Sequence, residues 1–204
     1  MKPEIPPPQD LHDATEKAAN ALTDQSAEQM VWLGAEQVGE RWRLPVLNDT
    51  LEVDIAAGEV TTSSGEAVRP AWRLLALHYL GVRGRPQGGQ PKIVFADLAG
   101  GRPYAGVYQQ RVNKRLCGTA GRDLPTLTAG AEAIGTSKAE GGDAAFDIRA
   151  FPRILTRLIW YAADDEFSAS ATLLLPVDIE EFFCVEDVVV LSESIVSRLS
   201  GHAF

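Results

Sequence analysis

The sequence has few cysteines and no long apolar run, and each of these absences removes a class of protein. Its 204 residues include two cysteines, Cys117 and Cys184. Two thiols are too few for a disulfide framework or for a cysteine-ligated metal cluster within this chain. No stretch approaches the roughly 20 apolar residues that a membrane-spanning helix needs. We therefore expect a cytoplasmic protein without a membrane partner.

The short motifs that mark common enzyme and cofactor sites are also missing. There is no G-x-x-x-x-G-K-[ST] or G-x-G-x-x-G loop for phosphates, and no G-x-S-x-G around a nucleophilic serine. The three histidines, His12, His78 and His202, are widely separated in the sequence. Without an H-x-x-x-H or C-x-x-C pair we expect no metal site of the zinc type. The sequence indicates no particular cofactor.

The first nine residues, MKPEIPPPQ, contain proline in place of the apolar core of a signal peptide. We interpret residues 1–9 as a flexible tail rather than a targeting signal. The remaining residues, 10–204, have the length of one ordinary domain. Because 45% of the chain is hydrophobic, this domain can bury a core of its own.

Charge is distributed unevenly along this acidic chain. The formal net charge is −9, which argues against a general nucleic-acid-binding protein. Between Arg69 and Arg122, however, ten Lys and Arg residues face a single acid, Asp97. This basic segment indicates one of two arrangements: it faces an anionic ligand or partner, or the acidic flanks of the chain fold onto it.

Hydrophobic periodicity predicts an α+β fold in a single domain, with a mainly antiparallel sheet and helices packed against it. Residues 146–150 alternate in the period of two that a half-buried strand requires. We expect strands near residues 41–55, 92–95, 145–161 and 168–175, helices over 70–82 and 186–200, and a mobile loop over 135–143. The core is expected to join one set of large side chains, namely Trp72, Leu75, Tyr79, Trp160 and Leu191.

Two glycine-rich loops and a helix of the basic segment predict a binding site for a small anion. Arg85, Lys92 and Arg102 lie in or beside the loops, and Arg111 lies on the helix that follows. Guanidinium and ammonium groups bind phosphate and carboxylate groups well. Two neutral hydrogen-bonding side chains complete the hypothesis. They are His78 and Tyr104.

Two other functions remain open. In the first, the basic segment docks an acidic protein partner. In the second, a hydrolase or lyase uses the adjacent carboxylates of Asp164, Asp165 and Glu166 to divide acid and base roles. Aspartate is also a favoured turn residue, so this cluster is equally consistent with the solvated tip of a hairpin.

Several segments together resemble the bacterial and archaeal family catalogued as Domain of Unknown Function 3786. They are LLALHYL (74–80), the loop–strand–loop over 84–104, AFPRI (150–154) and W-x-x-x-D-x-E-F (160–167). The resemblance covers about residues 44–199 and leaves the proline-rich tail and the first helix outside. It implies no established activity, an occurrence largely in anaerobes and a link to their redox metabolism. Some members carry an additional iron–sulfur domain, but this chain has no cysteine cluster.

Overall fold

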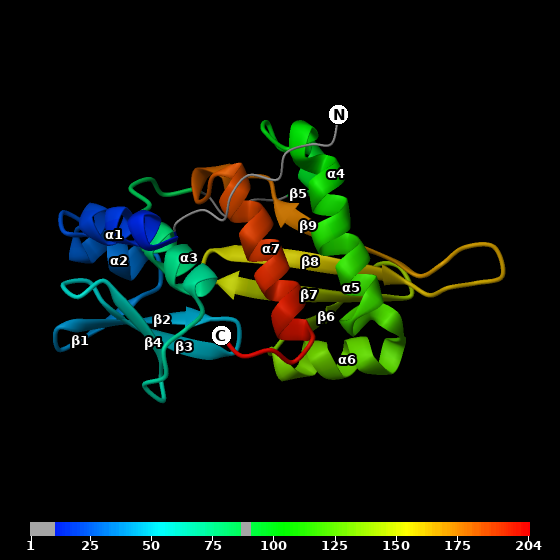
Figure 1. The fold of residues 1–204 in the computed structure, drawn as a ribbon, viewed down its shortest axis with the longest axis horizontal. Coiled ribbons are helices and arrows are strands. Elements are labelled where there is room, and N and C mark those ends of the chain that lie inside the picture. Colours follow the sequence, from blue (N-terminus) through cyan, green and yellow to red (C-terminus); the bar gives the residue numbers. More distant parts are fainter. Residues whose placement is uncertain (1–10, 87–90) are drawn as a thin grey trace.

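The structure, a computed structural model, describes residues 11–86 and 91–204 of the chain. The predicted tail over residues 1–9 lies outside the described residues. Two antiparallel sheets with helices packed on them confirm the predicted α+β fold (Figure 1). None of the helices in these ranges is both long and apolar enough to cross a lipid bilayer.

The first sheet is a meander of four antiparallel strands in the order β1-β2-β3-β4. Its central strand β2 alternates along its length, with Trp42, Leu44 and Val46 buried and the intervening residues exposed. This alternation places one face of the sheet on the core and the other in solvent. The strands are β1 (Glu36–Val38), β2 (Arg41–Val46), β3 (Asp49–Asp54) and β4 (Glu59–Thr62).

The second sheet has five antiparallel strands in the order β5-β9-β8-β7-β6. Strand β8 alternates over its whole length, and its buried residues Thr156, Leu158 and Trp160 face the helices. Strands β8 and β9 form the hairpin that the sequence predicts. The strands are β5 (Lys92–Ile93), β6 (Ser137–Ala139), β7 (Ala144–Phe151), β8 (Ile154–Tyr161) and β9 (Ser170–Pro176).

Three details of the strand prediction need correction. The strands over residues 41–55 form a sheet of their own and do not pair with those over 145–175. The strand expected over residues 92–95 ends at Ile93, and a 3₁₀ turn, η1 (Phe95–Asp97), follows it. The loop expected over residues 135–143 contains β6, which pairs with β7 through Lys138 and Phe146. A three-residue strand has too few positions to show alternation, so periodicity misses it.

The helices lie on one side of the second sheet and beside the first (Figure 1). In Figure 1, α7 and the segment containing α4 and α5 run across the face of the second sheet. A turn η2 (Arg102–Tyr104) precedes α4, and η5 (Ile179–Glu181) precedes α7. The helices are α1 (Leu11–Leu22), α2 (Ala27–Trp32), α3 (Pro70–Leu80), α4 (Ala105–Tyr108), the π-helix η3 (Gln109–Lys114), α5 (Arg115–Gly118), η4 (Ala120–Arg122), α6 (Leu124–Ala133) and α7 (Val185–Leu199).

Helix α3 is the centre of the core. Seven of its eleven residues are buried, as its apolar residues on nearly every side predict. The ring of Tyr79 stacks on that of Phe151 in β7, with centroids 4.6 Å apart. Its hydroxyl donates to the carbonyl of Leu33 at 2.7 Å and accepts the N–H of Arg153 at 3.1 Å. The five side chains predicted to share one core are all buried in a single cluster.

Leu75, which is fully buried on α3, provides a test of this core. The substitution Leu75→Ala should lower the free energy of unfolding by about 2–5 kcal/mol, because it removes buried methyl groups and leaves a cavity. Chemical denaturation measures the change. Leu124→Ala is the matched control, since Leu124 is 43% exposed. Equal effects of the two substitutions would contradict a central position for α3.

Candidate functional site

A row of polar contacts fastens α7 to the segment formed by α4, η3 and α5. The π-helical turn η3 lies in the middle of this segment, and π-helical turns are rare and recur at functional sites. The contacts follow one another in the same order along both helices, and those on the α4–α5 segment are about one turn apart. They are Tyr108–Ser192, Arg111–Glu193 and Arg115–Ser197, at 3.0, 2.6 and 2.8 Å respectively.

A cavity of about 190 Å³ opens beside this row of contacts, where the first turn of α3 meets α5 and α7. We call it the three-helix cavity. Four helical or chain-terminal segments contribute to its wall. The lining residues are Arg69, Ala71, Trp72, Arg115, Val190, Glu193, Ser194, Ser197 and Ala203.

Helix α3 begins at this cavity without a side-chain cap. The first N–H that bonds within the helix is that of Arg73, which reaches the carbonyl of Arg69 at 3.1 Å. Pro70 has no N–H, so Ala71 and Trp72 carry the N–H groups that lack a carbonyl partner in the helix. These groups and the helix dipole make this end of α3 partially positive.

Ser194 presents an unpartnered hydroxyl at the same cavity. Its side chain lies on α7 and the residue is only 8% exposed, yet its hydroxyl has no hydrogen-bond partner among the described residues. Ser192, two residues earlier, is fully buried but donates to the carbonyl of Val188 at 2.8 Å. The Ser194 hydroxyl is not among the fully buried atoms without a partner in the described residues, so it is open to the cavity and available to a bound molecule.

The charged groups at the cavity leave it positive. Arg69 and Arg115 line the wall directly. The one acid among the described lining residues, Glu193, accepts hydrogen bonds from Nε and Nη2 of Arg111 at 2.6 and 2.7 Å. Burial lowers the pKa of the Arg198 guanidinium, Asp49 raises it, and Arg69 lowers it by a smaller amount than Asp49 raises it.

Three of the six residues predicted to bind an anion contact acidic side chains of the flanks. His78 Nδ1 lies 2.7 Å from Asp187 Oδ2 at the start of α7, and Arg111 pairs with Glu193. Arg85 pairs with Glu28 of α2 at 2.5 Å. The acidic flanks therefore do fold onto part of the basic segment.

The other three predicted residues lie apart from these contacts. Lys92 is on β5 at the edge of the second sheet, whereas Arg102 and Tyr104 are exposed on η2. None of the six lines the three-helix cavity. Sequence reasoning counted Arg69 and Arg115 in the basic segment without selecting them. The start of a helix at Pro70 without a capping residue was an available signal for Arg69.

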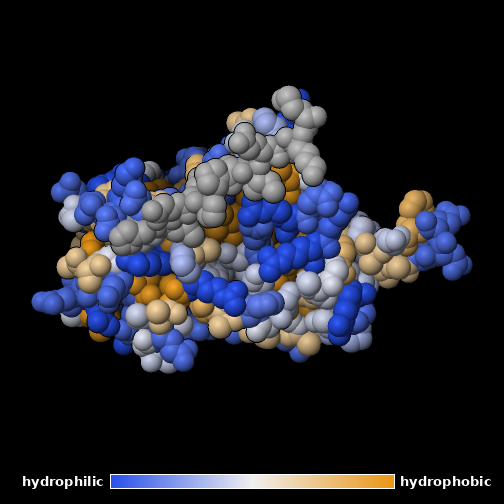
Figure 2. All heavy atoms as spheres, viewed as in Figure 1, coloured by the Kyte–Doolittle hydropathy of each residue, from blue (hydrophilic) through white to orange (hydrophobic). Residues whose placement is uncertain are grey.

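The acidic cluster lies at the end of the β8–β9 hairpin. We call residues 162–169 the arm, which stands out from the body of the molecule with hydrophobic and hydrophilic residues together at its end (Figure 2). Asp164 Oδ1 accepts the N–H groups of Glu166 and Phe167 at 2.9 and 2.7 Å, and these bonds lower its pKa. Asp165 and Glu166 are exposed beside it.

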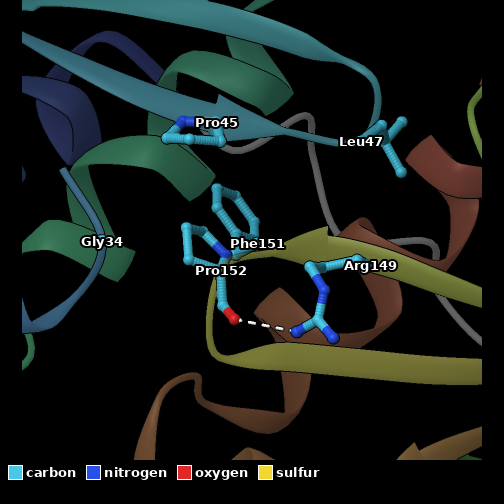
Figure 3. Close-up of a pocket in the computed structure, with 6 residues that line it drawn as sticks. All are labelled: Gly34, Pro45, Leu47, Arg149, Phe151 and Pro152. Carbon is cyan, nitrogen blue, oxygen red and sulfur yellow. Dashed lines mark hydrogen bonds between the residues drawn. The ribbon is translucent and has the colours of Figure 1, made fainter.

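A second cavity, of about 310 Å³, lies between the two sheets. We call it the inter-sheet cavity. Figure 3 shows Pro45 and Leu47 from the first sheet on one side, with Phe151, Pro152 and Arg149 from the β7 end on the other. Arg149 donates to the carbonyl of Pro152 at 3.0 Å. Gly34 completes the lining, and Arg149 is the one charged residue in it among the described residues.

Comparison with known protein families assigns the chain to one of them. The family described as a domain of unknown function, DUF3786, matches residues 26–198. The chain belongs to this family. The match begins before residue 44, where the sequence resemblance was expected to start, and so includes α2 and β1 of this DUF3786 domain. The first helix remains outside it, as expected. No curated protein and no solved structure matches the chain.

Residues suited to hold a metal ion do not converge in the described part of the DUF3786 domain: no group of three or more His, Cys, Asp and Glu side chains is arranged for one. The three-helix cavity instead combines hydrogen-bond donors and positive charge. Its arrangement suits an anion held by N–H and O–H groups.

Paired serine substitutions on α7 test the description of this cavity. Ser194→Ala should change the free energy of unfolding by less than about 0.5 kcal/mol, because no hydrogen bond is lost. Ser192→Ala should cost about 1–3 kcal/mol, because it leaves the buried hydroxyl of Tyr108 without its partner. Denaturation of both variants under the same conditions measures the difference. A larger loss for Ser194→Ala would mean that its hydroxyl is bonded within the protein.

Proposed function

We propose that this DUF3786 domain binds a small anionic molecule, one bearing a phosphate or carboxylate group, in the three-helix cavity. The observation that carries the proposal is the hydroxyl of Ser194, which has no partner among the described residues and lies at the cavity beside two arginines and the uncapped start of α3. All three kinds of group donate hydrogen bonds. Anionic oxygens accept such bonds most strongly, and helix N-termini and arginine forks are their usual sites.

The size of the cavity limits what it holds. Its volume of about 190 Å³ lies below the roughly 300–1,000 Å³ of pockets for drug-sized ligands. It therefore fits a small anion, or the anionic end of a larger molecule whose remainder extends into solvent. The partly apolar wall from Trp72 and Val190 favours a carbon-bearing anion over a fully hydrated ion.

The proposal keeps the idea of anion binding through the basic segment and moves its site. Arg69 and Arg115 stand near the two ends of that segment in the sequence. Folding brings them to one cavity, whereas Arg85 and Arg111 are paired with acids. The six residues selected from the sequence remain the alternative site, and the experiment below includes one of them.

The two cysteines and the net charge support a proposal about the compartment in which the domain works. We propose that the domain works in a reducing cytoplasm, because Cys117 and Cys184 are free thiols. Burial raises the pKa of Cys117, which keeps it as a thiol rather than a reactive thiolate. A net charge of −9 disfavours nucleic acid as the anion.

Calorimetric titration with inorganic phosphate, phosphorylated metabolites and dicarboxylates tests the proposed function. Arg69→Gln and Arg115→Gln should each weaken binding of the best ligand by about ten- to a hundredfold, since each removes a charged hydrogen bond. Arg122→Gln removes the same charge from the basic segment. In the described part of the chain Arg122 contacts Asp123 and Thr126 and does not line the cavity, so binding should not change.

Two results would contradict this assignment. One is that no member of the panel binds the wild-type domain. The other is that Arg102→Ala weakens binding while Arg115→Gln does not, which would move the site to the residues selected from the sequence.

A further inference from the structure

The arm has features that the fold itself does not require. It joins β8 and β9 through residues 162–169, whereas hairpin loops usually have about 2–5 residues. Figure 1 shows it extending away from the sheet and past the helices. Phe167 on the arm is 69% exposed, more than any other large hydrophobic side chain in the described part of the chain. An aromatic ring held in water in this way is typical of a contact residue.

The turn at the end of the arm fixes Phe167 next to carboxylates. Asp164 accepts two backbone N–H groups, and its own N–H donates to the carbonyl of Phe167 at 2.9 Å. Asp165 and Glu166 lie between these two residues and are exposed. A complementary surface must therefore offer an apolar hollow for the ring and a positive charge at its rim.

The inter-sheet cavity of the same chain has this chemistry. Pro45, Leu47 and Phe151 make its wall apolar, and Arg149 supplies a positive charge with no acid in the lining (Figure 3). Its volume is about 310 Å³. For comparison, an engineered apolar cavity of about 150 Å³ in another protein holds benzene. The inter-sheet cavity therefore has room for a phenylalanine ring.

An arm cannot enter the cavity of its own chain. The cavity lies at Phe151, beside the start of β8 at Ile154, and the arm begins at the other end of β8, after Tyr161. These two ends of the strand are about 23 Å apart at the usual rise of a strand. The arm also extends away from the end of β8 that lies next to β2 and β3 (Figure 1). An occupant with the chemistry of the arm must come from a second chain.

We propose that two copies of the chain form a two-fold dimer, in which the arm of each copy places Phe167 in the inter-sheet cavity of the other, with its carboxylates near Arg149. A two-fold axis perpendicular to the strands brings the arm end of one sheet to the cavity end of the other. The same contact then forms twice, as a closed two-fold interface requires.

The helix-free face of the second sheet supports this arrangement. Trp160 points to the helices, because its indole N–H donates to the carbonyl of Gly121 at 2.7 Å. Neighbours along a strand point to opposite faces, so Ile159 lies on the other face. Arg149 pairs across the strands with Leu155 on that same face. Ile159 and Leu155 are partly exposed on this face, and Arg157 between them is paired with Asp147 at 2.7 Å. The face therefore combines apolar positions with an ion pair already closed within the sheet, which is compatible with sheet-on-sheet packing.

Sedimentation velocity of the full chain, at concentrations up to about 1 mM, tests the dimer. The wild-type chain should reach twice its monomer mass of 22.0 kDa. Phe167→Ser and Arg149→Glu should each weaken association at least about tenfold, as removal of an interface hot spot does. The matched controls are Val107→Ser, on α4, and Arg122→Glu, which should leave association unchanged.

A charge exchange separates direct contact from general loss of structure. Arg149→Glu mixed with the double variant Asp165→Lys, Glu166→Lys should form heterodimers more tightly than either variant forms homodimers. Opposite charges meet at both contacts of the heterodimer, whereas like charges meet at both contacts of each homodimer. A wild-type chain that stays monomeric over the whole range would overturn the proposal. So would a dimer that Phe167→Ser leaves unchanged, or a charge exchange that restores nothing.

Discussion

The buried hydroxyl of Tyr79 is the contact on which the rest of the structure depends. It donates to Leu33, just after α2, and accepts from Arg153 in the turn between β7 and β8. One side chain thus fastens α3 to the connection into the first sheet and to the second sheet at once. Burial raises the pKa of this phenol, so the hydroxyl stays protonated and keeps both bonds. Its ring also stacks on Phe151, which lines the inter-sheet cavity.

The three-helix cavity follows from how α3 is held. Burial on most sides fixes the position of α3. Its first turn, which has no side-chain cap, is therefore held where α5 and α7 meet. Arg111 and Arg115 then hold α7 through Glu193 and Ser197, which sets the width of the gap. A rigid frame of this kind lets a few donors bind an anion without paying for their ordering. The cavity is therefore a consequence of core packing, with the donors already in place.

Much of the fold was accessible from the sequence because its strong patterns are local. The apolar positions of α3 on every side predicted a buried helix, and the alternation along β8 predicted a strand. The division into two sheets was not predictable in the same way. Alternation around Trp42 and around Leu158 is of the same kind, and pairing partners depend on contacts distant in sequence.

The candidate site was harder to predict than the fold. Composition indicated an anionic partner for the basic segment, but not which arginines the acidic flanks would neutralise. Arg111 pairs with Glu193, 82 residues away, and this long-range contact has no sequence signal. Ser194 gave no signal either, because an unpartnered hydroxyl is a property of packing. The chemistry of the individual side chains could therefore be predicted from the sequence, whereas the set of side chains that meet at one cavity could not.

Amide chemical shifts during titration with inorganic phosphate and with a small dicarboxylate test the central claim most directly, since they locate an anion residue by residue. The account predicts saturable shifts that are largest at the N–H groups of Ala71 and Trp72 and at Ser194, around the three-helix cavity. Saturable shifts centred on Arg102 and Tyr104, or shifts that rise linearly with concentration at scattered surface residues, would contradict it.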